Sequence, residues 1–244
     1  MEYLLDLGFM KYGRAWAIMR AIHEARVRNA VPDTLITVIH DHVYTTGRKG
    51  NASNLLKPIL PLYWVERGGD ITYHGPGQLI YYPVIKLRIP VGDFVTLLEE
   101  AVIKALSNYG IEARHNPSHR GVWVGDRKIC SIGIAIMDGV SLHGLALNVN
   151  TDLRYFTYIN PCGLDSSRIT SMHVELGKEV NIEEVKNKLT ESLASHLGMN
   201  LKSVTLNELI EGGLDPEKYG EPTRLGIVSP LMAPPDPSSR LPGP

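Results

Sequence analysis

Residues 67–78 read Arg-Gly-Gly-Asp-Ile-Thr-Tyr-His-Gly-Pro-Gly-Gln and form the most informative stretch of the chain. Glycine adopts backbone angles that other residues cannot, and it lets a ligand approach the main chain closely. Glycine also weakens a strand, so a purely structural strand would not be expected to contain this sequence. A bulged hairpin with turn glycines would explain the stretch equally well on its own. The residues around Lys128, His143 and Cys162 favour a binding site over that explanation.

The rest of the chain predicts a mixture of helices and strands. Hydrophobic spacing and capping residues predict helices at 9–30, from the N-cap Asp93 to Gly110, from Asn181 to Gly198, and after Thr205. Runs rich in β-branched and aromatic residues predict strands at 34–40, 62–67, 78–84, 121–125, 128–137 and 144–149. We therefore predict an α/β (α+β mixed) domain over residues 1–229, in which helices cover one face of a mixed β-sheet. The proline-rich tail, 230–244, is expected to be disordered.

Composition and charge exclude several classes of protein. The chain has 244 residues, of which 43% are hydrophobic and 21% charged, so it can bury a sizeable core. Its formal net charge of -1 gives no general attraction to nucleic acid or acidic lipid. It has no apolar run of about 18 residues and no signal-peptide pattern at its start. We expect a cytoplasmic globular protein that binds neither nucleic acid nor membranes.

Cys162 is the first candidate for chemistry. It lies between Pro161 and Gly163, which predicts a rigid, tight loop where a buried structural cysteine is unusual. A free cysteine is nevertheless often buried and unreactive. Nucleophilic catalysis needs the thiolate, so a nearby cation must lower the thiol pKa from about 8.5. No neighbour in the sequence does so, and the partner must come from elsewhere in the fold.

Lys128 is the best candidate for that partner, because it opens an apolar strand directly after a turn. A solvated lysine at a strand edge is the simpler interpretation. His74 and His143 compete for the role of base, since a Cys–His pair is the more usual arrangement. His40 and His42 share one strand face and could hold a metal, but no third ligand is apparent. We therefore favour surface or packed histidines there and expect no metal.

Common nucleotide and hydrolase motifs are missing. The chain has no G-x-x-x-x-G-K-[ST] loop and no G-x-S-x-G turn. Residues 75–80, Gly-Pro-Gly-Gln-Leu-Ile, lack the third glycine of a dinucleotide fingerprint. The sequence gives no support for ATP- or NAD-dependent chemistry, and we expect no cofactor.

Together these segments resemble the lipoyl(octanoyl) transferases, also called lipoate-protein ligase B. The matching stretches follow in family order and comprise Tyr44–Arg48, Asn54–Leu56, Arg67–Gln78, Tyr82–Pro83, Gly121–Val124, Arg127–Ile129, Ser131–Gly133, His143–Val149 and Asn160–Gly163. The Arg67–Gln78 motif is highly specific. A chance resemblance is excluded by its coincidence with Lys128 and Cys162.

The resemblance implies transfer of an octanoyl group from octanoyl-acyl carrier protein to a lysine of apo lipoyl domains, in 2-oxoacid dehydrogenases and the glycine cleavage H protein. It implies the fold of the biotin and lipoate protein ligase catalytic module, a mixed sheet flanked by helices. It also implies that Cys162 carries the acyl thioester and that Lys128 lowers its pKa. The family residues that contact the acyl substrate correspond to Arg67, Gly68, Gly69, Asp70, Ile71, Thr72, Tyr73, His74, Ser131, Ile132, Gly133, Gly144, Leu145 and Ala146.

Several alternatives stay open. The chain could be an ATP-dependent lipoate or biotin protein ligase, a noncatalytic lipoyl-domain-binding protein or a thioesterase, although none of these needs both Lys128 and Cys162. Octanoyl-CoA would present the same thioester as the carrier protein. Cys130 stands where a small apolar residue such as alanine is expected. It either fills that space or forms a disulfide with Cys162 that blocks the nucleophile.

Overall fold

Two β-sheets form the framework of the protein, for which the computed structural model describes residues 1–163 and 165–225. The strands of the large sheet are β1 Glu2–Phe9, β2 Thr34–Ile39, β6 Gln78–Val84, β7 Arg114–His115, β8 Val122–Val124, β9 Arg127–Met137, β10 Val140–Asn148 and β11 Leu201–Val204. Their order is β11-β1-β2-β6-β10-β9-β8-β7, with parallel pairs at the β11 edge and antiparallel pairs elsewhere. The small sheet comprises β3 Val43–Thr46, β4 Leu62–Trp64, β5 Thr72–His74 and β12 Arg224–Leu225.

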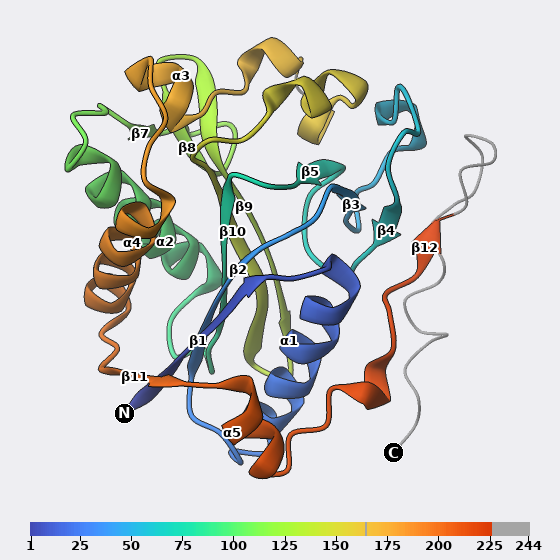
Figure 1. The fold of residues 1–244 in the computed structure, drawn as a ribbon, viewed down its shortest axis with the longest axis vertical. Helices are drawn as coiled ribbons and strands as arrows, with labels where there is room; N and C mark the ends of the chain where they lie inside the picture. The colour runs from blue at the N-terminus through green and yellow to red at the C-terminus, as the bar shows by residue number, and fades with distance from the viewer. Residues whose placement is uncertain (164, 226–244) are drawn as a thin grey trace.

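Helices pack on both faces of the large sheet (Figure 1). Helix α1, Tyr12–Val27, packs on β2, β6 and β10, and the helices α2, Val91–Ser107, and α4, Ile182–Leu197, pack together on the opposite face. The prediction that helices cover one face is wrong. Strand β6 shows why, since Leu79 and Tyr81 belong to the α2–α4 core while Ile80 and Tyr82 belong to the α1 core. A strand that is apolar on both sides needs a cover on each.

Strands β9 and β10 carry large residues on one face and small residues on the other. Leu145 and Leu147 of β10 pack in the α2–α4 core, as does Cys130 of β9. Because successive side chains point to opposite faces of a strand, the residues between them face α1. These residues are Ser131 and Gly133 on β9 and Gly144 and Ala146 on β10. Their small size leaves room for a cavity on the α1 face.

The predicted helices and all six predicted strands are confirmed, with shifted ends. Asn181 and Thr205 cap α4 and the short helix α5, Leu206–Glu211, through their side chains. Helix α2 begins before Asp93, because Pro90 takes the N-cap position and Asp93 lies in the first turn. Strands β1, β3, β5, β7, β11 and β12 and the short helix α3, Met172–Leu176, were not predicted. Strand β5 lies inside the glycine-rich stretch itself.

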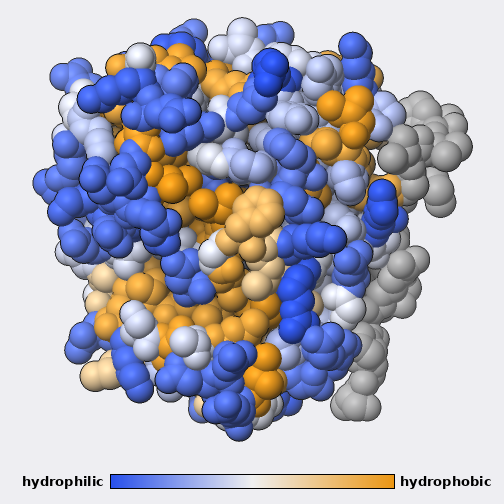
Figure 2. All heavy atoms as spheres, viewed as in Figure 1, coloured by the Kyte–Doolittle hydropathy of each residue, from blue (hydrophilic) through white to orange (hydrophobic). Residues whose placement is uncertain are grey.

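The face seen in Figure 2 has hydrophilic residues around its rim and hydrophobic residues across its middle. Phe9, at the end of β1, is 64% exposed and is among the large hydrophobic side chains at the surface. Within residues 1–163 and 165–225, no helix has the length and apolarity needed to cross a membrane. The tail that was expected to be disordered lies outside the described residues.

Candidate active site

A cavity of about 50 Å³ lies between the glycine-rich stretch and the α1 face of the large sheet. Three segments that are far apart in the sequence converge on it. Its lining includes eleven of the fourteen residues predicted to contact substrate, namely Arg67, Gly68, Gly69, Thr72, His74, Ser131, Ile132, Gly133, Gly144, Leu145 and Ala146. The convergence of all three segments on one cavity supports their assignment to a common site.

The other three predicted residues, Asp70, Ile71 and Tyr73, do not line the cavity. Ile71 and Tyr73 point away from it into a separate cluster with Phe156, as strand alternation around Thr72 requires. Asp70 accepts hydrogen bonds from the Asn51 main-chain N–H, at 3.0 Å, and from the Asn54 amide. These residues shape and anchor the stretch, and their contact with substrate stays a prediction.

The glycine-rich stretch is fastened to both sheets by Arg67 and Gly68. The guanidinium Nη2 of Arg67 donates to the main-chain oxygen and to Oγ1 of Thr45 in β3, at 2.8 and 2.9 Å. The N–H of Gly68 donates to the carbonyl of Ile134 in β9, at 2.9 Å. A Cβ on Gly133 would lie 3.2 Å from Cδ of Arg67, so glycine permits this close approach of the two segments.

His74 is a neutral member of a buried hydrogen-bonded chain. Its Nδ1 lies 2.8 Å from Oε1 of Gln78, which can only accept, so Nδ1 donates. Gln78 donates to Asn148 at 2.9 Å, and Asn148 donates to the Thr170 carbonyl at 3.0 Å. Burial, with the neighbouring His40, lowers the pKa of His74 to about 3. A histidine with so low a pKa is a weak proton acceptor near neutral pH, which weakens the case for His74 as the base.

His143 is engaged with a buried carboxylate. Its Nε2 lies at 3.3 Å from Oε2 of Glu66, an ion-pair distance without the alignment of a hydrogen bond. Glu66 also accepts from Arg20 at 3.0 Å and from the Trp16 indole at 3.2 Å. Burial alone would raise the pKa of Glu66, but His143 and Arg20 hold it well below its usual range. Because Glu66 precedes Arg67 and His143 precedes Gly144, this contact links two walls of the cavity.

Lys128 is buried at the start of β9. Its side chain is 5% exposed, so the interpretation as a solvated edge lysine is wrong. The ammonium Nζ lies 5.2 Å from the centroid of the Trp123 ring. Its main chain bridges Ile169 and accepts a hydrogen bond from the Thr170 N–H at 2.9 Å. Lys128 does not line the cavity, but it is three residues from Ser131, which does.

The loop that carries Cys162 is held between the glycine-rich stretch and Lys128. Residues Pro161–Gly163 form a single 3-10 turn that contacts β5. Before the turn, Asn160 donates to the carbonyl of Asn54, whose amide binds Asp70. After it, residues 169–170 pair with Lys128. The Cys162 side chain itself lies outside the described part, so its role and its distance to Lys128 stay predictions.

The remaining candidates have simpler explanations. Cys130 is completely buried in the α2–α4 core, where burial raises the pKa of its thiol, and this favours the space-filling interpretation. A disulfide with Cys162 stays an untested prediction. His40 contacts the Met10 carbonyl and the Tyr82 hydroxyl, and His42 contacts the Tyr73 hydroxyl. These separate partners favour packed histidines over a metal site.

Four residues of the cavity were not predicted to contact substrate: Tyr12, Ile80, Tyr82 and His143. Ile80 and Tyr82 are two residues apart on β6, so strand alternation could have predicted that both face the same side as the cavity. Tyr12 opens the hydrophobic stripe of α1, which gave no sign of which buried residues would face a cavity. His143 was considered only as a base.

Comparisons with known proteins identify the family of the chain. The lipoyl protein ligase A/B catalytic domain matches residues 11–194. A relative from Pyrobaculum calidifontis, named "Probable octanoyltransferase", is 51% identical over 188 residues, 77% of this chain and 82% of that protein. The "Octanoyltransferase" of Syntrophobacter fumaroxidans is 44% identical over 205 residues, 80% of this chain and 88% of that protein.

Among solved structures, a lipoate-protein ligase A bound with ATP has a TM-score of 0.73 and 22% identity, covering 86% of this chain and 92% of that one. This likeness confirms the predicted fold, a mixed α/β architecture with helices flanking the sheet. The family match and the two relatives cover most of the chain. The chain therefore belongs to the lipoyl protein ligase A/B catalytic-domain family, and its relatives within that family are octanoyltransferases.

Proposed function

We propose that the protein moves an octanoyl group from octanoyl-acyl carrier protein, through a thioester on Cys162, to a lysine of a lipoyl domain. The acceptors would be the E2 subunits of 2-oxoacid dehydrogenases and the glycine cleavage H protein, in the first step of protein lipoylation. The observation that carries the proposal is the convergence of the three predicted acyl-contacting segments on one cavity, with the Cys162 loop in contact with β5, which lines that cavity. The names of the two relatives support octanoyl as the group transferred.

In the first half-reaction, the Cys162 thiolate attacks the carbonyl carbon of the donor thioester. A new thioester forms on the enzyme, and the carrier leaves as a thiolate that takes its proton from the Lys128 ammonium, which would leave Lys128 neutral for the second half-reaction. The activated acyl bond is conserved in this exchange, so ATP is not required. The buried ammonium of Lys128 would stabilise the Cys162 thiolate through its positive charge.

In the second half-reaction, the amine of the acceptor lysine attacks the acyl-enzyme and Cys162 leaves as a thiolate. The attacking nitrogen must lose a proton, and a neutral Lys128 would accept it as general base. Main-chain N–H groups of the glycine-rich segments would stabilise the oxyanion of the tetrahedral intermediate. The acyl group ends as an amide on the acceptor lysine, whereas a thioesterase would transfer it to water.

The α1 face of β9 and β10 would hold the acyl chain against its small residues. Burying the six methylenes of an octanoyl chain contributes roughly 5 kcal/mol, at about 0.8 kcal/mol per methylene. One methylene more or less changes binding only modestly, so neighbouring chain lengths would be separated by about tenfold rather than absolutely. Pocket depth would set the preferred length.

The first alternative is an ATP-dependent ligase, to which the fold likeness with lipoate-protein ligase A directs attention. Ligases of this kind activate a free acid, whereas the proposed reaction uses a thioester. The discriminating experiment incubates the protein with octanoyl-acyl carrier protein and apo H protein without ATP. We expect octanoyl on one acceptor lysine, detected by intact mass.

Other outcomes of the same experiment would replace the proposal. Transfer that requires free octanoate and ATP would indicate a ligase. Release of octanoate without a modified acceptor would indicate a thioesterase, and binding of H protein without chemistry would indicate a noncatalytic partner. Octanoyl-CoA in place of the carrier protein tests the identity of the donor.

A further inference from the structure

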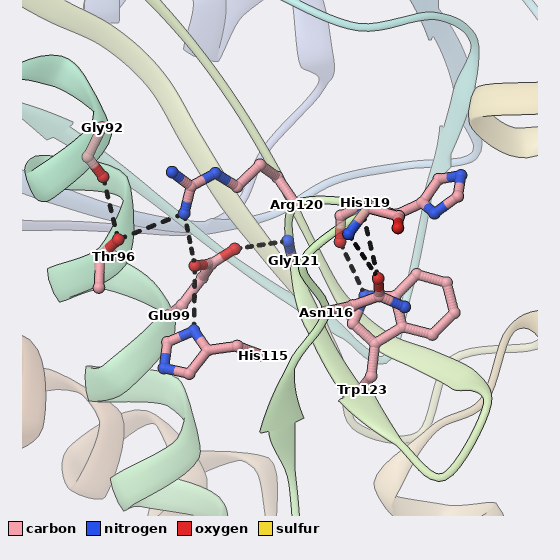
Figure 3. Close-up of polar contacts among 10 residues, drawn as sticks. Gly92, Thr96, Glu99, His115, Asn116, His119, Arg120, Gly121 and Trp123 are labelled. Carbon is pink, nitrogen blue, oxygen red and sulfur yellow. Dashed lines mark hydrogen bonds and ion pairs between the residues drawn. The ribbon is translucent and has the colours of Figure 1, made fainter.

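Glu99 of α2 is a buried carboxylate that the proposed reaction does not use. Its residue is 1% exposed, although burying a carboxylate is costly unless the charge is paired. Its Oε1 accepts from the Gly121 main-chain N–H at 2.7 Å, and its Oε2 lies 3.1 Å from both Nη1 of Arg120 and Nδ1 of His115 (Figure 3). All three partners belong to residues 115–121, which we call the 115–121 loop. Glu99 therefore anchors this loop to α2.

The 115–121 loop also fixes the indole of Trp123. The Trp123 Nε1 donates to the main-chain carbonyl of His119 at 3.0 Å, as Figure 3 shows. The carbonyl is itself held in a turn, since Oδ1 of Asn116 accepts from the N–H groups of Ser118 and His119, at 2.9 and 3.2 Å. Trp123 is completely buried. The orientation of its ring thus depends on a loop that Glu99 holds in place.

Lys128 contacts both Trp123 and Gly121. Its Nζ lies 5.2 Å from the centroid of the Trp123 ring, within the range of a cation–π interaction. Gly121 packs against its aliphatic stem, because a Cβ on Gly121 would lie 3.3 Å from Cε of Lys128 and 2.5 Å from the Cys130 carbonyl. The φ of Gly121 is 121°, which favours glycine. The guanidinium of Arg168 also lies 5.2 Å from the Trp123 ring, so two cations share this indole.

We propose that Glu99 is a positioning residue for Lys128. By anchoring the 115–121 loop, Glu99 sets the places of Gly121 and Trp123, and these two residues set the place of the Lys128 ammonium. The inference rests on the proposed role of Lys128 beside Cys162. Strand β9 would thus contact the acyl chain on its α1 face, while Lys128 at the start of the same strand is positioned by Glu99 of α2.

The test measures acylation of Cys162 by octanoyl-CoA, a simple thioester probe, as a function of pH, in wild type and in Glu99→Ala. If Lys128 is displaced, the thiolate loses stabilisation, and the midpoint of the pH–rate curve moves upward. We expect a shift of about one pH unit or more, which is about a tenfold loss of rate on the rising limb of the curve. In Glu99→Gln the amide oxygen can still accept from Gly121, so a smaller shift is expected.

A double-mutant cycle separates positioning from a general structural role. If Glu99 acts through Lys128, the Glu99→Ala change should shift the midpoint in wild type but add little in a Lys128→Ala background. Ser192→Ala is the matched control, because the Ser192 hydroxyl donates to the Ala101 carbonyl at 2.8 Å and joins α4 to α2 away from the loop. It should lower the melting temperature without moving the midpoint.

The outcomes distinguish the inference from the proposed function. An unshifted midpoint in both Glu99 variants, or equal and additive effects in the two backgrounds, would overturn the positioning role while leaving acylation of Cys162 intact. If wild type itself forms no adduct on Cys162, the proposed function fails first and the inference with it. Should Glu99→Ala not fold, the Glu99→Gln variant carries the same comparison.

Discussion

The two faces of β9 and β10 differ in what they bury. On the α2–α4 face, Cys130, Leu145 and Leu147 fill a continuous core. On the α1 face, Ser131, Gly133, Gly144 and Ala146 leave a cavity that the glycine-rich stretch covers. The same strands therefore serve stability on one side and binding on the other. This difference predicts that substitutions on the α2–α4 face will lower stability, whereas substitutions of adjacent residues on the α1 face will lower activity.

A second cavity shows that volume does not identify the site. The cavity between α1 and α5 is larger, about 200 Å³, and its lining includes Tyr3, Glu24 and Arg28. It contains none of the segments that resemble the family's acyl-contacting residues. The smaller cavity is the candidate because three separated motifs meet there.

The largest effect is expected at Lys128, at the start of β9. Lys128→Ala removes the buried ammonium and should lower the rate of octanoyl transfer by about 10²–10⁴, the usual contribution of a general acid–base group. Single-turnover assays of each half-reaction would measure it. A near-normal rate would reassign the base to His74 or His143, and a comparison of His74→Ala with His143→Ala would show which.

On the α2–α4 face, Leu147→Ala should cost stability. Leu147 is completely buried, and truncating such a leucine typically costs about 2–5 kcal/mol through lost burial and a residual cavity. Urea unfolding followed by circular dichroism would give the change. The rate per folded molecule should stay near that of wild type, and a selective loss of activity at full stability would contradict the division between the faces.

The α1 side should also be the acid-sensitive side. His40 and His74 have ring centroids 6.0 Å apart, and burial lowers their pKa values to about 4 and about 3. Above an unfolded pKa of about 6.5 both states are neutral, so stability is unaffected. As the pH falls below that value, only the unfolded chain takes up protons, and each histidine should cost about 2 kcal/mol by pH 5.

The substitution His40→Gln tests that acid sensitivity. Glutamine can still donate to the Met10 carbonyl and accept from the Tyr82 hydroxyl, but it does not titrate. The fall in unfolding free energy between pH 6.5 and 5 should be smaller by about one histidine's share. An unchanged slope would show that His40 does not remain neutral in the fold.

The smallest effect is expected one residue before Leu147. Ala146→Leu places a larger side chain in the cavity and should lower kcat/KM for octanoyl transfer by about tenfold, as loss of a methylene or two of pocket depth would. Stability should change little, because the added atoms occupy the cavity. Transfer of a shorter acyl chain, such as butanoyl, should suffer less. Equal losses for both chain lengths would mean that Ala146 does not bound the acyl site.

Much of this architecture could be predicted from local sequence. Asn181, Thr205 and Gly198 marked helix ends because their side chains or backbone angles satisfy the ends directly. Strand β5 was missed, since three residues between glycines carry no periodicity of their own and pair only with β3. The covering of both sheet faces was not predicted, because it follows from β6 being apolar on both of its sides.

The site, too, has a part that could be predicted from the sequence and a part that could not. The segments that converge on the cavity could be predicted because the resemblance to the octanoyltransferases implies them, each as a contiguous motif. Glu99 could not, because on α2 it is one acidic residue on a helix that is otherwise read for its apolar stripe. Its partners come from a loop whose position only the tertiary structure supplies. The role of a buried carboxylate depends on its partners, and the sequence alone does not identify them.

In the proposed reaction the acyl group passes through Cys162. Intact mass of the protein after incubation with octanoyl-acyl carrier protein tests it most directly, with Cys162→Ala as the comparison. We predict one octanoyl adduct on wild type that disappears on addition of apo H protein, and no adduct on Cys162→Ala. An adduct that persists in Cys162→Ala, or transfer to H protein by that variant at the wild-type rate, would contradict the account.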